Sequence, residues 1–102
     1  MLLAWLDTRH VVEFAQSIVA EIREAMPAAD ETSSRKESRK EIDKRGRKIE
    51  RLTQRARAFS REHRLNFYKK AKFANTLKWE LKEAGYSEVF VREMVAHILV
   101  NL

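Results

Sequence analysis

The sequence of 102 residues contains no cysteine, one proline and only two glycines. The absence of cysteine excludes disulfides, zinc sites with thiolate ligands, iron–sulfur clusters and cysteine nucleophiles. Turns in sheet proteins depend heavily on glycine and proline, so a chain with so few of them favours an all-α fold. The length suits a single domain with a small hydrophobic core.

Long apolar runs are also missing. The apolar start MLLAWL reaches Asp7 after six residues and has no basic region before it, which is typical neither of a secretory leader nor of a membrane span. Asp7 instead stands where the N-cap of a first helix is expected. We therefore predict a protein without a membrane span and with a cytoplasmic location.

Charge and apolar residues are unevenly distributed along the chain, whose net charge is +6. Residues 33–72 carry 16 basic and 5 acidic groups, whereas residues 1–32 have a net charge of −4 and residues 73–102 a net charge of −1. Apolar residues make up 18 of the first 32 positions, 10 of the next 40 and 17 of the last 30. The two ends are expected to build the core, with the middle as a charged helical element.

Apolar residues recur at three- and four-residue steps in several segments, which predicts about four helices. The run SRKESRKE at 34–41 gives the Ser-x-x-Glu capping box twice. The apolar phase changes from Arg64 to Asn66, which we interpret as a helix break capped by Asn66; one continuous helix with a stutter is the alternative. Gly85 fits a left-handed helix end and Ser87 the next N-cap. The prediction is one small all-α domain, 1–102, with an apolar helix 8–25, a loop 26–33, a long basic helix 34–64, a helix 66–84 and a C-terminal helix 87–101.

The long basic helix carries a narrow apolar stripe with heptad spacing, as in a coiled coil of about three heptads. Because this helix is longer than its neighbours, we expect it to overhang them and to pair with a second copy of the chain. Gly46 lies inside the stripe at a cost of about 1 kcal/mol relative to alanine, so we expect a kink or a close helix crossing there. The predicted self-association residues are Ile42, Ile49, Leu52, Ala56 and Phe59.

The basic segment is the strongest functional signal, because Glu62 is the single acidic residue between Arg51 and Lys72. Like charges four residues apart destabilise a helix, and an anionic partner would relieve that repulsion. Arginine donates two parallel hydrogen bonds to phosphate, and aromatic side chains can stack on unpaired bases. The aromatic candidates are Phe59, Phe67, Tyr68 and Phe73. The predicted residues that bind nucleic acid, RNA or DNA, are Lys48, Arg51, Arg55, Arg57, Arg61, Arg64, Lys69, Lys70 and Lys72.

Two other interpretations of the basic helix are open. Its charges could simply keep it soluble, in which case the protein is a structural or protein–protein interaction module that dimerises through the apolar stripe and has no nucleic-acid role. Alternatively, the helix could lie on an anionic membrane with its aromatic residues inserted, although its apolar face is narrow for that role.

Nothing in the sequence points to catalysis, a cofactor or a small-molecule substrate. His10, His63 and His97 lie in separate helical contexts without a second ligand three or four residues away, so we predict no metal site. Glycine-rich phosphate loops and serine or threonine nucleophile motifs are absent from the sequence. We therefore expect a non-catalytic binding protein.

The run LKEAGYSEVFVREMV at 81–95 is similar to the helix, Gly-aromatic turn and helix of ubiquitin-associated-type domains, which bind protein partners through that turn. The similarity covers 15 of the 102 residues. The highly basic helix before it departs from that family, so no function is carried over from the resemblance.

Overall fold

The computed structural model describes residues 7–27 and 39–102. Within these residues the chain forms four α-helices and no strand, which confirms the predicted all-α fold. The helix ends lie within one residue of the expected positions, except that the expected start of the basic helix at residue 34 falls outside the described residues. None of the described helices is both long enough and apolar enough to pass through a membrane. The helices are α2 (Arg9–Ala25), α4 (Arg39–His63), α5 (Phe67–Glu83) and α6 (Glu88–Val100).

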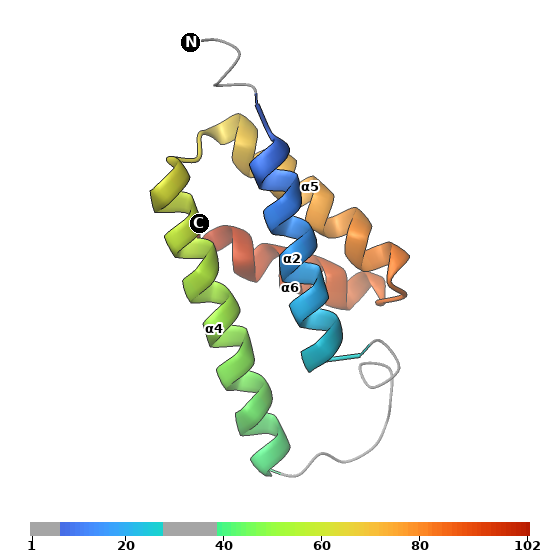
Figure 1. Ribbon diagram of the computed structural model, residues 1–102. Helices are drawn as coiled ribbons and strands as arrows, with labels where there is room; N and C mark the ends of the chain where they lie inside the picture. The colour runs from blue at the N-terminus through green and yellow to red at the C-terminus, as the bar shows by residue number, and fades with distance from the viewer. Residues whose placement is uncertain (1–6, 28–38) are drawn as a thin grey trace.

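The arrangement is a three-helix unit with a longer helix along one side. α2 packs mainly on α5, and α5 and α6 form a hairpin (Figure 1). α4 contacts α2 and α6 and continues past the C-terminal end of α2 (Figure 1). The basic helix therefore combines one stretch that packs on the other helices with another stretch beyond them.

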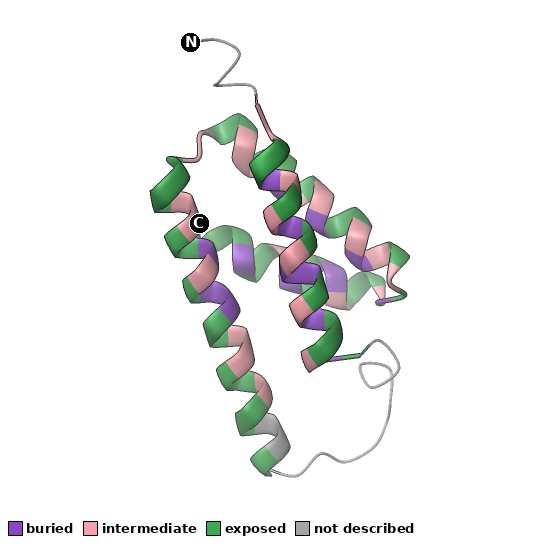
Figure 2. Ribbon diagram, viewed as in Figure 1, coloured by how far each residue is buried: buried purple, intermediate pink, exposed green. Residues whose placement is uncertain are grey.

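The core lies between the inner faces of these helices. α5 contributes Phe73, Leu77 and Leu81, which are completely buried, whereas the fully buried apolar side chains of α4 are Leu52 and Ala56 (Figure 2). Burial of a large apolar side chain stabilises a fold by about 1.5–3 kcal/mol. The remaining buried apolar side chains, from α2, α6 and the flanking turns, are Val11, Ala15, Ile18, Val19, Ile22, Met26, Tyr86, Val91, Met94 and Ile98.

The turn between α5 and α6 has the predicted cap geometry. Gly85 has a φ of 96°, in the left-handed region that favours glycine. Its N–H donates to the Lys82 carbonyl at 3.0 Å, and the Tyr86 N–H donates to the Leu81 carbonyl at 3.2 Å, the two bonds of a Schellman motif. The Ser87 hydroxyl accepts from the Phe90 N–H at 3.2 Å and caps α6. The expectations for Gly85 and Ser87 are thus confirmed.

The corner between α4 and α5 is a true helix break, so the two-helix interpretation is the one observed. Arg64 adopts a φ of 46°, and the Leu65 N–H donates to the Ser60 carbonyl at 3.2 Å. The Asn66 side chain then accepts from the Lys69 N–H at 2.8 Å and caps α5 as expected. A left-handed conformation costs a residue with a Cβ roughly 1–2 kcal/mol. Because an arginine takes this conformation here in place of a glycine, no glycine marks the corner in the sequence.

Two local expectations were wrong. The N-cap of α2 is Thr8 rather than Asp7, although the Asp7 carboxylate accepts from the Arg9 N–H at 3.1 Å and so satisfies one donor of the first turn. α4 continues through Gly46 as one helix, and a Cβ built at this glycine would meet nothing within 4 Å outside the backbone of its own helix. No close helix crossing explains this glycine.

The phenol of Tyr86 joins the α5–α6 turn to the end of α2. Its hydroxyl donates to the Met26 carbonyl at 2.6 Å in a buried contact. A buried carbonyl left without a donor would cost about 1–3 kcal/mol. This bond therefore helps to fix the hairpin against α2.

Candidate nucleic-acid interface

The basic surface of α4 begins earlier than the sequence prediction placed it. The helix carries ten basic and four acidic residues, for a net charge of +6. Cations recur at three- and four-residue steps, which places them on one side of a helix. All have exposed or partly exposed side chains. We call this set the basic row; its members are Lys40, Lys44, Arg47, Lys48 and Arg51.

Three members of the basic row, Lys40, Lys44 and Arg47, were missed by the sequence prediction. The helical spacing that unites them with Lys48 and Arg51 is visible in the sequence and could have found them. Two acidic residues of the same helix, Asp43 and Glu50, stand roughly 80–100° around the helix from the centre of the row. The centre of the row therefore has a single sign of charge along α4.

The nine predicted residues do not share one surface. Arg57 lies roughly 120° around α4 from Arg51, and Arg61 is offset from Arg55 by the same angle. The other predicted residues lie past the corner, at Arg64 and on α5. The structure thus separates the predicted set into three groups. Lys48 and Arg51 lie at the end of the basic row, a second group lies near the C-terminal end of α4, and the third group is on α5. The second group is Arg55, Arg57, Arg61 and Arg64, and the third is Lys69, Lys70 and Lys72.

Arg55 is engaged within the fold. Its guanidinium forms an ion pair with Glu21 of α2, donates to the Ser17 hydroxyl at 3.4 Å and lies 5.4 Å from the centroid of the Phe14 ring. Arg57 likewise donates a hydrogen bond to the Asn101 side chain. These two arginines connect α4 to its neighbours and are less available to a partner than the sequence suggested.

The other seven predicted cations have no ion pair with an acidic residue inside the ranges 7–27 and 39–102. One acidic edge belongs to α2, whose Glu21 and Glu24 line a groove of about 270 Å³ together with Lys48 and Arg51. One margin of the basic row is thus bordered by two carboxylates of α2. The opposite margin is flanked by Asp43 and Glu50 of α4 itself.

Two of the four aromatic candidates are not available for base stacking. Phe73 is completely buried, and the Phe59 ring stacks on Phe14 with centroids 4.1 Å apart. Phe67, by contrast, is 87% exposed at the first position of α5, and Tyr68 is 44% exposed. The aromatic surface that remains therefore lies at the α4–α5 corner.

The predicted self-association stripe is largely filled from within the chain. Leu52 and Ala56 are buried in the core, while Ile49 and Phe59 pack against it with partial exposure. The side chain of Ile42 lies outside the described residues. In this fold Leu52 and Ala56 have no free surface for a second copy, and dimerisation stays a prediction.

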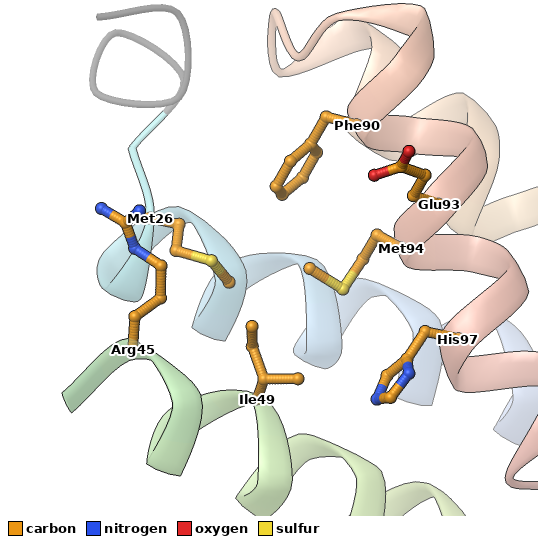
Figure 3. A pocket seen from close by; sticks show the side chains of 7 residues that line it. All are labelled: Met26, Arg45, Ile49, Phe90, Glu93, Met94 and His97. Carbon is orange, nitrogen blue, oxygen red and sulfur yellow. The ribbon is translucent and has the colours of Figure 1, made fainter. Parts of the chain in front are cut away.

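A separate pocket of about 410 Å³ opens between the end of α2, α4 and α6. Met26, Ile49 and Met94 point toward one another in it, with Arg45 and Glu93 at its margins (Figure 3). Its lining is mainly apolar, so it does not extend the basic surface. It separates α6 from the N-terminal part of α4.

The fold brings together two histidines that no sequence pattern connects. His10 of α2 stacks on His63 of α4 with ring centroids 5.5 Å apart. Among the described side chains, however, no group of three or more histidine, aspartate or glutamate residues is placed to hold a metal ion.

Comparison of the chain with known protein families, with curated proteins and with solved structures finds no significant match. Function is therefore inferred from the residues and their geometry.

Proposed function

We propose that the protein is a non-catalytic binding protein that holds a nucleic acid against the basic row of α4. The observation that carries the proposal is the row itself, which extends over about 17 Å from Lys40 to Arg51. Its members form no ion pair with an acidic residue of the described chain. Cations at this density repel one another unless an anion lies beside them.

A phosphate backbone supplies such anions at regular intervals. Each phosphate neutralised by a lysine or arginine releases condensed counterions, so affinity is gained without any reading of base sequence. Two of the five members, Arg47 and Arg51, are arginines, whose planar fork suits phosphate oxygens. Recognition of the backbone therefore matches the chemistry of the row.

The distribution of charge among the helices favours this role over simple solubility. Solubility is served by interspersed charges of both signs. Here α4 has a net charge of +6 and α5 one of +3, whereas α2 and α6 each have a net charge of −1. A high density of one sign, greatest on α4, is what an electrostatic binding surface requires.

The test is a binding titration with fluorescently labelled single-stranded RNA and duplex DNA at several salt concentrations. The variant is Arg47→Glu with Arg51→Glu, and the matched control is Lys78→Glu with Lys82→Glu on α5, which changes the net charge by the same amount. For duplex DNA we expect the slope of log affinity against log salt to fall by about 2 in the α4 variant. The control should retain the wild-type slope.

Equal loss of affinity in both variants would show that net charge alone attracts the polynucleotide. Absence of salt-sensitive binding by the wild-type protein would reject the proposal and leave the row as a solvated face. Comparison of the RNA and DNA affinities identifies the preferred polymer.

A further inference from the structure

The outer face of α6 carries exposed apolar side chains among charged ones. Val91, Met94 and Ile98 point into the core, yet Val89 is 54% exposed and Val100 is 84% exposed on the opposite side. Arg92, Glu93 and His97 of α6 are exposed as well, so this face is mixed rather than purely apolar. α6 therefore has a side that the described chain leaves uncovered.

The uncovered side continues into a groove between α5 and α6. The groove has a volume of about 480 Å³, and its floor includes Val95, Ala96 and Leu99. Ala96 and Leu99 are exposed, so the floor is open to a partner. The small side chain of Ala96 leaves room for close approach of another helix. We call this feature the α5–α6 groove.

The margins of the α5–α6 groove carry three cations and one acid: Lys78, Lys82 and Arg92 against Glu88. Trp79 is half-exposed beside the two lysines, whose Nζ atoms lie 5.8 and 5.4 Å from its ring centroid. An exposed tryptophan is typical of anchor residues at protein interfaces. The groove thus has an apolar floor and a positively charged margin.

We propose that the α5–α6 groove binds an amphipathic helix of another protein, with apolar residues toward the floor and acidic residues along the lysine margin. Helices dock in grooves through apolar anchors at three- and four-residue steps, and flanking charges select the partner. The valine and leucine floor offers nothing to a phosphate backbone, so this surface differs in chemistry from the basic row of α4. The inference does not depend on the nucleic-acid proposal.

A second copy of the chain fits the groove poorly. In a two-fold symmetric pair, each surface meets an identical surface. Such a pair would set two margins against each other, each with three cations and the single acid Glu88. Facing like charges disfavour that pairing.

The probe is a labelled synthetic helix with leucines at positions i, i+3, i+4 and i+7 and glutamates on either side. A control peptide has lysine in place of every glutamate. Anisotropy titrations give the affinities, and methyl NMR shifts of Val95 and Leu99 report the location. The variants are Lys78→Glu with Lys82→Glu for the charge, Ala96→Gln for the floor, and Arg47→Glu with Arg51→Glu as the control on α4.

We expect the wild-type protein to prefer the acidic peptide and the lysine variant to bind it roughly tenfold more weakly, as expected for two exposed ion pairs. Ala96→Gln should weaken both peptides because it fills the floor, whereas the α4 variant should bind as the wild type does. Circular dichroism confirms that each variant is folded.

Four results would overturn the inference. They are equal affinity for the two peptides, an unchanged affinity in the lysine variant, no binding of the acidic peptide at about 1 mM, or a dimer that Ala96→Gln dissociates. The last result would assign the groove to a second copy. The same α4 and α5 variants are used in the polynucleotide titration, with the roles of test and control exchanged. Either proposal can therefore fail while the other stands.

Discussion

α5 and α4 meet at one corner but are held in place very differently. α5 buries Phe73, Leu77 and Leu81 completely within 17 residues. α4 has 25 residues, and its fully buried apolar side chains among those described are Leu52 and Ala56. A short buried stretch is thus enough to anchor a long helix, and the rest of that helix remains free to carry charge.

The anchoring contacts of α4 lie toward its C-terminal half. The Thr53 hydroxyl donates to the Ile49 carbonyl at 3.0 Å and lies 3.2 Å from the Nε2 atom of His97 on α6. Phe59 stacks on Phe14, and Arg55 pairs with Glu21. The N-terminal half continues past α2, so its charges do not have to be desolvated by folding.

The largest expected effect tests whether α5 rather than α4 carries the stability. Phe73→Ala removes a completely buried ring and should lower the free energy of unfolding by about 3–5 kcal/mol. Phe59→Ala should cost less because that ring is partly exposed. Urea denaturation followed by circular dichroism measures both. Equal losses would show that the two helices contribute alike to stability.

A smaller effect tests whether the N-terminal half of α4 opens independently. Gly46→Ala adds a methyl group that meets no atom outside the helix backbone, so only helix propensity changes. The helix should gain at most about 1 kcal/mol of stability, which corresponds to a roughly fivefold increase in amide protection. Hydrogen exchange should show this gain in α4 near residue 46 and no change around Leu77. A uniform gain in both helices would mean that they unfold together.

The smallest expected effect lies at the start of α2, where the contact is local and exposed. The hydrogen bonds from the Arg9 side chain and backbone lower the pKa of Asp7 from 3.8 to about 2. A carboxyl with a lowered pKa in the folded state stabilises that state above pH 3.8 and loses this contribution as the pH falls toward 2. The Arg9 amide shift, followed by NMR, should titrate in this window.

Asp7→Asn provides the control for this titration, because it removes the ionising carboxyl and should abolish the shift. The core amides of α5 should not respond in either protein over the same pH range. A shift of the α5 amides would show that the first turn of α2 is coupled to the core.

The sequence allowed the helix ends to be predicted where the signal is local. Gly85 and Ser87 act through bonds to residues within four positions, and Asn66 caps α5 through an amide three residues away. The left-handed Arg64 could not be identified, because arginine rarely adopts that conformation. In the sequence, the helix break at this corner is visible only as a change in the phase of the apolar residues.

Which side chains of the candidate site stay accessible could not be predicted from the sequence. The basic character of α4 followed from composition, but the engagement of Arg55 depends on Glu21, which is 34 residues away in the sequence. The same is true of Phe59, whose stacking partner Phe14 lies on α2. No pattern within α4 distinguishes these side chains from exposed ones of the same type.

The sequence by itself determined that the chain is helical, where two of its corners are capped and on which helix the positive charge is most concentrated. These properties arise from hydrogen bonds and side-chain spacings that span only a few residues. The tertiary structure decided which arginines and aromatic rings stay accessible, and it left one side of α6 and the adjoining α5–α6 groove uncovered. Accessibility depends on what packs against a side chain, and the packing partners come from distant parts of the chain.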